Sequence, residues 1–246
     1  MGTQKSQRLD KILAHMGIGT RKEIKKLVRA GRVRLNGITA NDPGIHVYPD
    51  QDELTVDGIP IHYREHIYLM MNKPQGVISA TEDRFNEVIS DLLEPEHRVF
   101  DPFPVGRLDK DTEGLILLTN DGKLSHQLLS PKKHVPKVYY ALVEGAVTEA
   151  DREAFASGIT LDDGYETLPG QLRILNSGPV SEVEVTIYEG KYHQVKRMFE
   201  AVGKRVKFLK RIAMGPLSLD PDLEPGEYRE LSDEEIEMLK KATSSR

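Results

Sequence analysis

Residues 106–122 read GRLDKDTEGLILLTNDG. The first half of this stretch is rich in Gly, Asp and Thr and predicts a loop, whereas the apolar run at 115–119 is typical of a buried strand. Asn120, Asp121 and Gly122 then predict a turn. A carboxylate in the loop, such as that of Asp109, would be held rigidly at the mouth of the strand, as a nucleophile must be.

The composition is that of a globular protein. The chain has 246 residues, 38% hydrophobic and 30% charged, enough for one large domain or for a small domain joined to a medium one. No apolar run approaches the ~20 residues of a membrane span, and residues 1–5 lack the apolar core of a secretory signal. The absence of cysteine excludes disulfides, thiolate metal sites and thiol catalysis, and it suits a reducing compartment, so we expect a cytoplasmic protein.

The charges are unevenly distributed. The formal net charge is -5, which alone argues against a nucleic-acid partner. Residues 1–36, however, hold ten Lys or Arg against two acids, and residues 190–211 hold eight against one, whereas 220–239 hold nine acids against Arg229. Basic faces on an acidic body are typical of an RNA-binding protein.

The first sixty residues predict two helices and a small sheet. Residues 9–16 have helical spacing and end at Gly17, and Thr20 with Glu23 predicts a capping box at the start of a helix over 21–30. A short strand at 33–35 and hairpins at 36–37 and 57–58 follow. The stretch RLDKILAHMGIGTRKEIKKLVRAGRVRLNG, residues 8–37, resembles the S4 RNA-binding domain. Such a domain positions a protein on phosphates rather than choosing a base.

The remaining chain predicts a second, larger domain. Residues 63–66 read as a linker, and a new strand begins at 67. Long strands with interspersed helices and many hairpin signals predict an α+β domain built on an antiparallel sheet. Further strands are predicted at 138–143, 172–175, 183–188 and 206–212, and helices at 124–129, 149–156, 192–202 and 233–240.

Four ordered motifs resemble the RsuA-like family of ribosomal RNA pseudouridine synthases: NKPxGV at 72–77, GRLDxxTxGLxxxTxDG at 106–122, KxY at 137–139 and EGKYHQVKRM at 189–198. The resemblance extends from about Arg8 to Leu231. It implies an S4-like α/β domain at 1–62, a linker at 63–66, and a catalytic domain at 67–246 with a mainly antiparallel mixed sheet flanked by helices. It also implies site-specific isomerisation of uridine to pseudouridine in ribosomal RNA.

Three side chains carry the implied chemistry. The resemblance selects Asp109 as the nucleophile, Tyr139 as the aromatic that stacks on the target base, and Lys196 as the cation beside the carboxylate. Helical geometry also favours Lys196 over Arg197, because Lys196 flanks the apolar stripe of its helix and Arg197 lies on the outer side. Many family members have Arg at position 196, and Lys keeps the charge but loses bidentate geometry. Asp111 and Glu113 are interpreted as solvated or turn-stabilising residues.

One carboxylate suffices for this reaction, whereas a glycosidase normally needs two. Breaking the N1–C1′ bond, turning the uracil and joining C5 to C1′ needs neither water nor redox chemistry. The carboxylate can attack the sugar, attack the base, or remove a proton from the sugar, and the sequence does not choose among these. We therefore expect no cofactor, and histidine spacing gives no metal site.

The expected partner is ribosomal RNA, most closely 16S RNA in an assembly intermediate of the small subunit, because residues 129–131 and 226–231 resemble small-subunit members of the family. Alternatives are a synthase acting on 23S RNA, or a non-catalytic S4-type RNA-binding or ribosome assembly factor. We expect a monomer without a membrane partner. The residues expected to bind RNA are Arg8, Arg21, Lys22, Lys25, Lys26, Arg29, Arg32, Arg107, Lys137, His193, Gln194 and Arg197.

Overall fold

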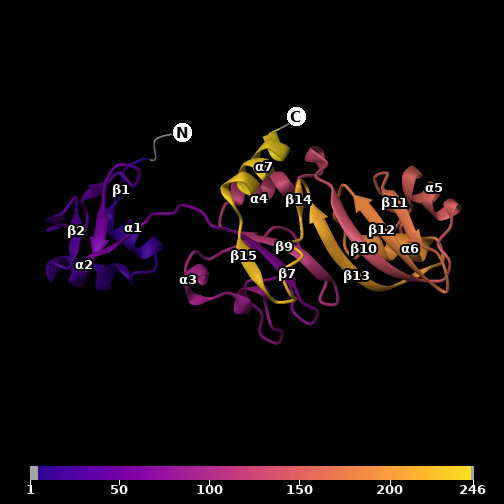
Figure 1. Ribbon diagram of the computed structural model, residues 1–246, viewed down its shortest axis with the longest axis horizontal. Coiled ribbons are helices and arrows are strands. Elements are labelled where there is room, and N and C mark those ends of the chain that lie inside the picture. The colour runs from indigo at the N-terminus through magenta and orange to yellow at the C-terminus, as the bar shows by residue number, and fades with distance from the viewer. Residues whose placement is uncertain (1–4, 245–246) are drawn as a thin grey trace. The chain divides into compact units, whose positions relative to one another are not determined.

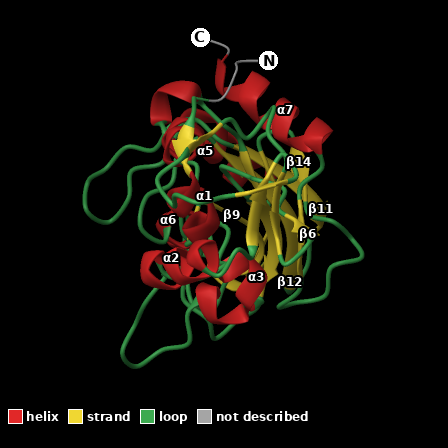
Figure 2. Cartoon of the chain, turned by 90° about the vertical axis from the view of Figure 1, so that its left-hand side faces the viewer, coloured by secondary structure: helices red, strands yellow, loops and turns green. Residues whose placement is uncertain are grey.

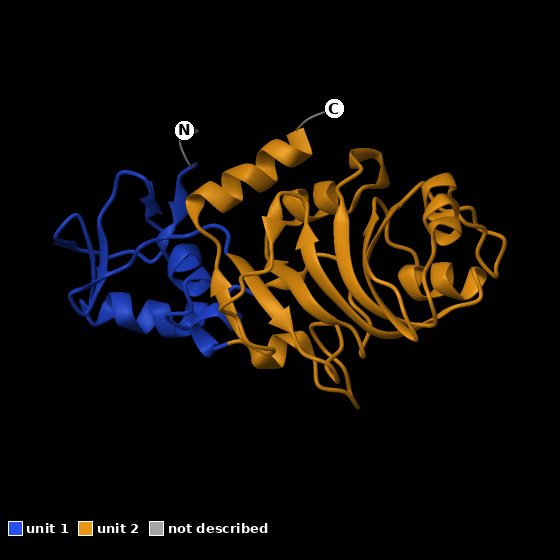
Figure 3. Cartoon of the chain, turned by 45° about the vertical axis from the view of Figure 1, so that its right-hand side comes forward, with its two compact units in different colours: residues 1–67, 94–101 blue, residues 68–93, 102–246 orange. Residues whose placement is uncertain are grey.

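The computed structural model describes residues 5–244, which fall into two compact units (Figure 3). Unit 1 comprises 5–67 and 94–101, and unit 2 comprises 68–93 and 102–244. The segment 94–101 joins unit 1 because Phe100 packs edge-on against His15, with 5.3 Å between ring centroids, and the guanidinium of Arg64 lies 5.3 Å from the Phe100 ring. The sequence reading assigned this segment to the larger domain.

Unit 1 has the two helices and the small sheet expected from its sequence. Helices α1 (Leu9–His15) and α2 (Arg21–Arg29) pack on antiparallel strands in the order β3-β2-β5-β6, and β1 pairs with β4. The capping box of Thr20 and Glu23 is present at the start of α2. The strand bounds are β1 (Gln7–Arg8), β2 (Val33–Leu35), β3 (Ile38–Thr39), β4 (His46–Val47), β5 (Leu54–Val56) and β6 (Ile59–Pro60).

The core of unit 1 forms where the two helices meet the strands. Leu9, Ile12 and Leu13 of α1 pack with Ile24 and Val28 of α2, in the 3.6-residue period that the sequence shows. Because this apolar stripe is buried, the remaining face of α2 is left to charged side chains.

Unit 2 is built on one mixed sheet, in the order β11-β12-β10-β13-β9-β7-β15 (Figure 1). Among the described residues, every pairing between two strands of this sheet is antiparallel except that of β13 with β9, and two isolated bridges, Ile78–Val88 and Gly145–Val180, are also parallel. The α+β class with a mainly antiparallel mixed sheet is therefore confirmed. The strand bounds are β7 (Tyr68–Lys73), β8 (Phe103–Pro104), β9 (Glu113–Thr119), β10 (Lys137–Glu144), β11 (Gln171–Asn176), β12 (Val180–Ile187), β13 (Arg205–Met214), β14 (Leu217–Ser218) and β15 (Tyr228–Glu230).

Helices flank this sheet in two groups. Figure 1 labels these helices, and Figure 2 colours helices differently from loops. Helix α4 packs against α7, while α5 packs on β11 and α6 on β13. The rings of Phe155 in α5 and Phe199 in α6 lie 4.9 Å apart and join the second pair. The helix bounds are α3 (Pro95–Arg98), α4 (Gly122–Leu129), α5 (Glu149–Ser157), α6 (Gln194–Ala201) and α7 (Asp233–Ser244), with 3₁₀ turns η1 (Ile89–Leu92) and η2 (Pro131–Lys133).

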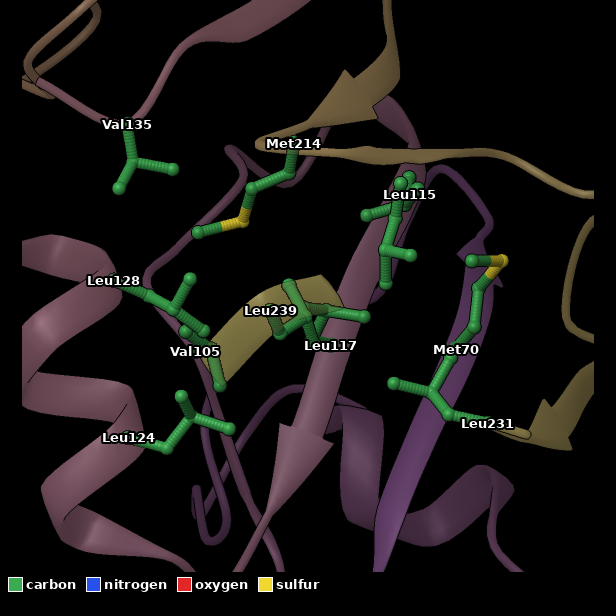
Figure 4. Close-up of a cluster of buried hydrophobic side chains, with 11 residues drawn as sticks. Met70, Val105, Leu115, Leu117, Leu124, Leu128, Val135, Met214, Leu231 and Leu239 are labelled. Carbon is green, nitrogen blue, oxygen red and sulfur yellow. The ribbon is translucent and has the colours of Figure 1, made fainter. Parts of the chain in front are cut away.

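Strand β9 lies in the middle of the unit 2 core. Leu115 and Leu117 pack with Leu124 of α4 and Leu239 of α7 (Figure 4). Residues 116 and 118 are also fully buried, so both faces of β9 are covered, as its continuous apolar run predicts. This buried strand is the anchor for the loop that precedes it.

Candidate active site

A pocket of about 600 Å³ lies in unit 2 beside that loop. Its walls come from segments far apart in the sequence, which the sheet brings together. The lining residues are those at 78–80, 106–110, 112, 129, 187 and 190–195, with Lys137 and Tyr139 of β10 and Leu209 and Arg211 of β13. Asp109, Tyr139, His193 and Arg211 therefore share one cavity.

The backbone of the loop 106–112 is held by hydrogen bonds from Lys73 of the NKPxGV segment and from Ser79. The ammonium group of Lys73, fully buried, donates to the carbonyl oxygens of Pro74 at 2.9 Å, Asp109 at 3.1 Å and Thr112 at 3.0 Å. The hydroxyl of Ser79 donates to the carbonyl of Leu108 and accepts from its N–H, at 2.9 and 3.0 Å. The backbone on both sides of the Asp109 carboxylate is thus held in place.

Two glycines allow this loop to approach its neighbours. Gly114 has a φ of +103°, and a Cβ there would lie 2.2 Å from the carbonyl oxygen of Arg211, which no side chain can occupy. Gly106 has a φ of +78°, and a Cβ would lie 2.9 Å from Leu129. Glycine at 114 therefore permits the parallel pairing of β9 with β13 that places the loop beside Arg211.

Lys196 bridges the two aspartates of the loop. Its Nζ lies 3.0 Å from Oδ2 of Asp109 and 2.6 Å from Oδ1 of Asp111. Asp109 is the more enclosed of the two, with 26% of its side chain exposed against 72% for Asp111. His193 Nε2 lies 3.5 Å from the other oxygen of Asp109. Asp111 is thus more than the solvated turn residue that the sequence suggested, because it shares the lysine.

The charges of this cluster support one another. Burial alone would lower the pKa of Lys196, but its hydrogen bonds to Asp111 and Asp109 outweigh that effect and raise the pKa. The hydrogen bond from Lys196 holds the pKa of Asp111 below its usual value. Burial lowers the pKa of Lys73 to about 8, although the charges of Asp109, Asp111 and Glu113 oppose this shift. Lys196 is therefore a permanent cation beside Asp109 at neutral pH.

Tyr139 of β10 is buried and lines the pocket where the sheet forms its wall. Its cross-strand partner is Arg211 on the neighbouring strand β13. Lys137 lies on the same strand and also lines the pocket, with its Nζ donating to the carbonyl of Val135 at 3.1 Å. Lys137 was expected to contact RNA, and its burial restricts any such contact to a nucleotide that enters the pocket.

The turn before α6 is organised by the buried carboxylate of Glu189. That carboxylate accepts from the hydroxyl of Tyr165 at 2.6 Å, the N–H of Leu168 at 2.8 Å and the amide of Gln194 at 3.0 Å. Gln194 also accepts from the N–H of Lys191. We expected Gln194 to bind RNA, but it is buried and its amide is committed to these partners, so its observed contacts are structural.

Arg197 also departs from the expectation. The helical position placed it on the outer side, facing RNA, but its side chain is only 13% exposed. Its guanidinium binds Asp162, with 2.6 Å from Nε to Oδ1, and Asp163, with 2.7 Å from Nη2 to Oδ2. Helix periodicity predicts which way the Arg197 side chain points. It carries no information about the distant acidic turn at 161–164, whose carboxylates neutralise the guanidinium.

The expected RNA-binding residues of unit 1 differ in how free they are. Arg8 forms an ion pair with Asp10, and Arg32 forms one with Asp57. The cations of α2 are exposed, and within residues 5–244 none of them forms an ion pair: Arg21, Lys22, Lys25, Lys26 and Arg29. Arg107 of unit 2 is likewise exposed at the pocket.

Three residues of this site were not singled out from the sequence: Lys73, Ser79 and Arg211. Lys73 lies in the NKPxGV motif, but the sequence alone assigns this lysine no role. The available signal was its position just after the apolar run at 67–71, where a lysine is unusual. Ser79 and Arg211 act through contacts between segments distant in sequence, which no local pattern shows. Among residues 5–244, no cluster of three or more acidic, histidine or cysteine side chains is placed to hold a metal ion, and no helix is long and apolar enough to cross a membrane.

Comparison with known proteins gives two matched families. Residues 67–201 match the RNA pseudouridylate synthase family, and residues 7–52 match the S4 domain. A solved structure described as a pseudouridylate synthase is 38% identical, covers 95% of this chain and all of its own, and superposes with a TM-score of 0.67.

Curated relatives match along almost the whole chain. An uncharacterised RNA pseudouridine synthase of Bacillus subtilis, YtzG, is 54% identical over 94% of this chain and 98% of its own. The ribosomal small subunit pseudouridine synthase A of Vibrio vulnificus is 40% identical, over 94% and 99%. The ribosomal large subunit pseudouridine synthase B of Bacillus subtilis is 36% identical, over 95% and 96%.

Proposed function

The chain belongs to the RNA pseudouridylate synthase family and carries an S4 domain, and we propose that it isomerises a uridine of ribosomal RNA, specifically of 16S RNA in an assembly intermediate of the small subunit. Flipping a uridine out of its stack costs a few kcal/mol, which favours a loop or a partly folded RNA over a finished subunit. We propose further that it works as a monomer in the cytoplasm and without a cofactor.

The observation that carries the catalytic assignment is the position of Asp109. Its carboxylate lies beside the Lys196 ammonium, and it shares a pocket with the buried ring of Tyr139. Lys196 pairs with the carboxylate and orients it, the Lys73 and Ser79 contacts fix its backbone, and Tyr139 offers a flat face to a base. In this proposal Asp109 is the nucleophile, Tyr139 stacks on the uracil, and Lys196 positions Asp109.

The 16S target is supported by the likeness of residues 129–131 and 226–231 to small-subunit enzymes. The small-subunit relative is 40% identical and the large-subunit relative 36%, a difference too small to separate the two targets. A 23S target is therefore the second candidate, and measuring which of the two RNAs is modified decides between them.

The test is release of tritium from 16S and 23S transcripts labelled at uridine C5, using wild type, Asp109→Asn and Asp111→Asn. Wild type is expected to release tritium from the 16S transcript and to form no free uracil. Asp109→Asn should release none while still binding RNA. Asp111→Asn should keep its rate within about tenfold of wild type, because its exposed ion pair contributes little.

Each other outcome changes the assignment. Release from the 23S transcript alone would move the target to the large subunit, and free uracil would indicate a hydrolase. RNA binding without release from either transcript or from precursor particles would favour the non-catalytic assembly factor. Equal loss in the two aspartate variants would contradict the choice of Asp109.

A further inference from the structure

Three adjacent strands form the floor of the pocket. Tyr139 of β10 is the cross-strand partner of Arg211 in β13, and Lys137 of β10 is the partner of Ile187 in β12. All four residues line the pocket. A nucleotide that stacks on Tyr139 would therefore have Arg211 and Lys137 beside it.

Arg211 is only 2% exposed, and its hydrogen bonds are incomplete. Its Nε donates to the carbonyl of Leu115 at 2.7 Å, but Nη2 is buried without a partner, and no carboxylate of residues 5–244 lies within ion-pair distance. The hydroxyl of Thr112, which lines the same pocket, is also buried without a partner. Buried donors are nearly always satisfied, so an unpaired guanidinium N–H in a pocket indicates an acceptor brought by the ligand.

Lys137 adds a second cation with the same character. In the described part of the chain its ammonium donates only to the carbonyl of Val135 and makes no ion pair. Burial together with the neighbouring Arg211 lowers its pKa to about 8. The acid that favours its charge, Glu189, is itself held by Tyr165, Leu168 and Gln194. The floor thus carries positive charge that the described protein residues leave unneutralised.

We propose that Arg211, assisted by Lys137, is a further catalytic residue that binds a carbonyl oxygen of the target uracil and stabilises the negative charge that the ring gains during isomerisation. The inference rests on the proposed function. It assigns the guanidinium the part of an oxyanion-type donor, held in advance at a buried position on the pocket floor.

The three routes open to Asp109 all place charge on those oxygens. If the carboxylate attacks C1′ or removes a proton from C2′, the C1′–N1 bond breaks and its electron pair stays on uracil, shared by N1, O2 and O4. If it attacks C6, the electrons of the C5–C6 double bond move onto O4. Formation of the C5–C1′ bond takes the charge back. Asp109 is released in the same sequence of steps, because its bond to C1′ or C6 breaks or because it returns the proton to C2′. C5 then loses its proton to solvent and N1 gains one, so the atoms balance without a co-reactant.

The test compares wild type, Arg211→Met and Arg211→Lys in single-turnover reactions at saturating RNA, with Kd for the same RNA measured alongside. Arg211→Met is expected to slow the chemical step about 100-fold with Kd nearly unchanged, and Arg211→Lys, which keeps a cation, about tenfold. Arg205→Met, an exposed arginine on the same strand, is the matched control and should react like wild type.

The second arm uses RNA with 5-fluorouridine at the target, followed by nucleoside analysis for its disappearance. Fluorine withdraws electrons and stabilises negative charge on the ring, so the deficits of both Arg211 variants should shrink with this substrate. A purely structural role would give the same fold-loss with both substrates, and that result would overturn the proposal. So would a Kd that rises as much as the rate falls.

Arg211→Met also loses the bond to Leu115, so thermal unfolding of each variant has to be recorded. If Arg211→Met does not fold, Arg211→Lys with the two substrates decides the question by the same criterion. Lys137→Met, in which Arg211 is intact, should show a smaller deficit that also shrinks with 5-fluorouridine. Conversion of ordinary uridine by wild type tests the proposed function separately from these comparisons.

Discussion

Lys73 keeps a fully buried ammonium group whose hydrogen-bond partners are all backbone carbonyls. A charge in that setting costs free energy, which lowers its pKa to about 8 from 10.5. The same holds for Lys137, with a pKa of about 8. Fixing the loop of Asp109 through Lys73 therefore has a cost in stability that depends on pH.

We predict that the free energy of unfolding contains a component that rises between about pH 8 and 10.5. Over that range the unfolded chain binds more protons at these two lysines than the folded chain does, so stability increases with pH, by at most about 3 kcal/mol for each lysine. Below pH 8 both states are protonated and the full cost is present. Urea unfolding at pH 7.5 and 9.5 measures the difference.

Lys73→Met and Lys137→Met should each remove about half of this component. Lys123→Met, at an exposed position of α4, should leave it intact and corrects for other groups that titrate in the same range. An unchanged pH dependence in both buried-lysine variants would mean that neither ammonium is the source.

The sequence predicts single residues where a motif or a helix period carries them. The motifs give Asp109 and Tyr139, and the angle on the helix favours Lys196 over Arg197. The Nζ of Lys196 lies 3.0 Å from Asp109, and the roles of the three residues stay predictions. Arg211 was not foreseen, because its importance depends on the unpaired Nη2 and on the strand opposite it. Local sequence patterns predict the direction of a side chain, but they do not predict which residues of distant segments it contacts.

At the scale of elements, the approach of β9 to β13 depends on Gly114. We predict that Gly114→Ala destabilises the protein by about 3 kcal/mol or more, because the new Cβ would collide with the carbonyl of Arg211 in addition to straining the backbone. The surviving folded fraction should react about 100-fold more slowly, since the loop of Asp109 would be displaced. Urea unfolding and single-turnover tritium release measure the two effects.

Gly145→Ala separates strain from collision. Gly145 also has a positive φ, +87°, but a Cβ there would meet nothing within 4 Å. This variant should therefore show the backbone cost alone, about 1–2 kcal/mol, with normal activity. Equal destabilisation by the two substitutions would show that close approach at Gly114 is not what matters.

Most helices and long strands were foreseen, because their apolar periods and turn signals are local. The helix predicted at 192–202 is shorter, Gln194–Ala201, because His193 adopts a left-handed conformation at its start. Strand β15, Tyr228–Glu230, was missed, since three residues carry no period and it forms by pairing with the distant β7. The order of the strands, and the parallel pair β13–β9 above all, depends on contacts that a local pattern does not contain.

At the scale of the whole molecule, the net charge of -5 conceals the basic face of α2. Deleting residues 1–62 is an unsuitable test of that face, because the segment 94–101 belongs to the same unit and would lose its packing against His15. Substitutions that remove charge without removing core side chains are cleaner. Lys22 and Lys26 are exposed, one helical turn apart, and suit this purpose.

We predict that the double variant Lys22→Gln with Lys26→Gln weakens RNA binding and flattens its salt dependence. Each phosphate contact adds about 0.7–0.9 to the slope of log K against log salt through counterion release, so two lost contacts should reduce it by about 1.5. The pair Lys240→Gln with Lys241→Gln, on exposed positions of α7, changes the net charge equally and should leave the slope unchanged. Filter binding between 50 and 200 mM salt measures the slopes. Over this range of salt the affinity of a protein that contacts several phosphates changes by about 1,000-fold or more, which is easily measured. Equal slopes for the two variants would mean that net charge, rather than the face of α2, draws the RNA to this protein.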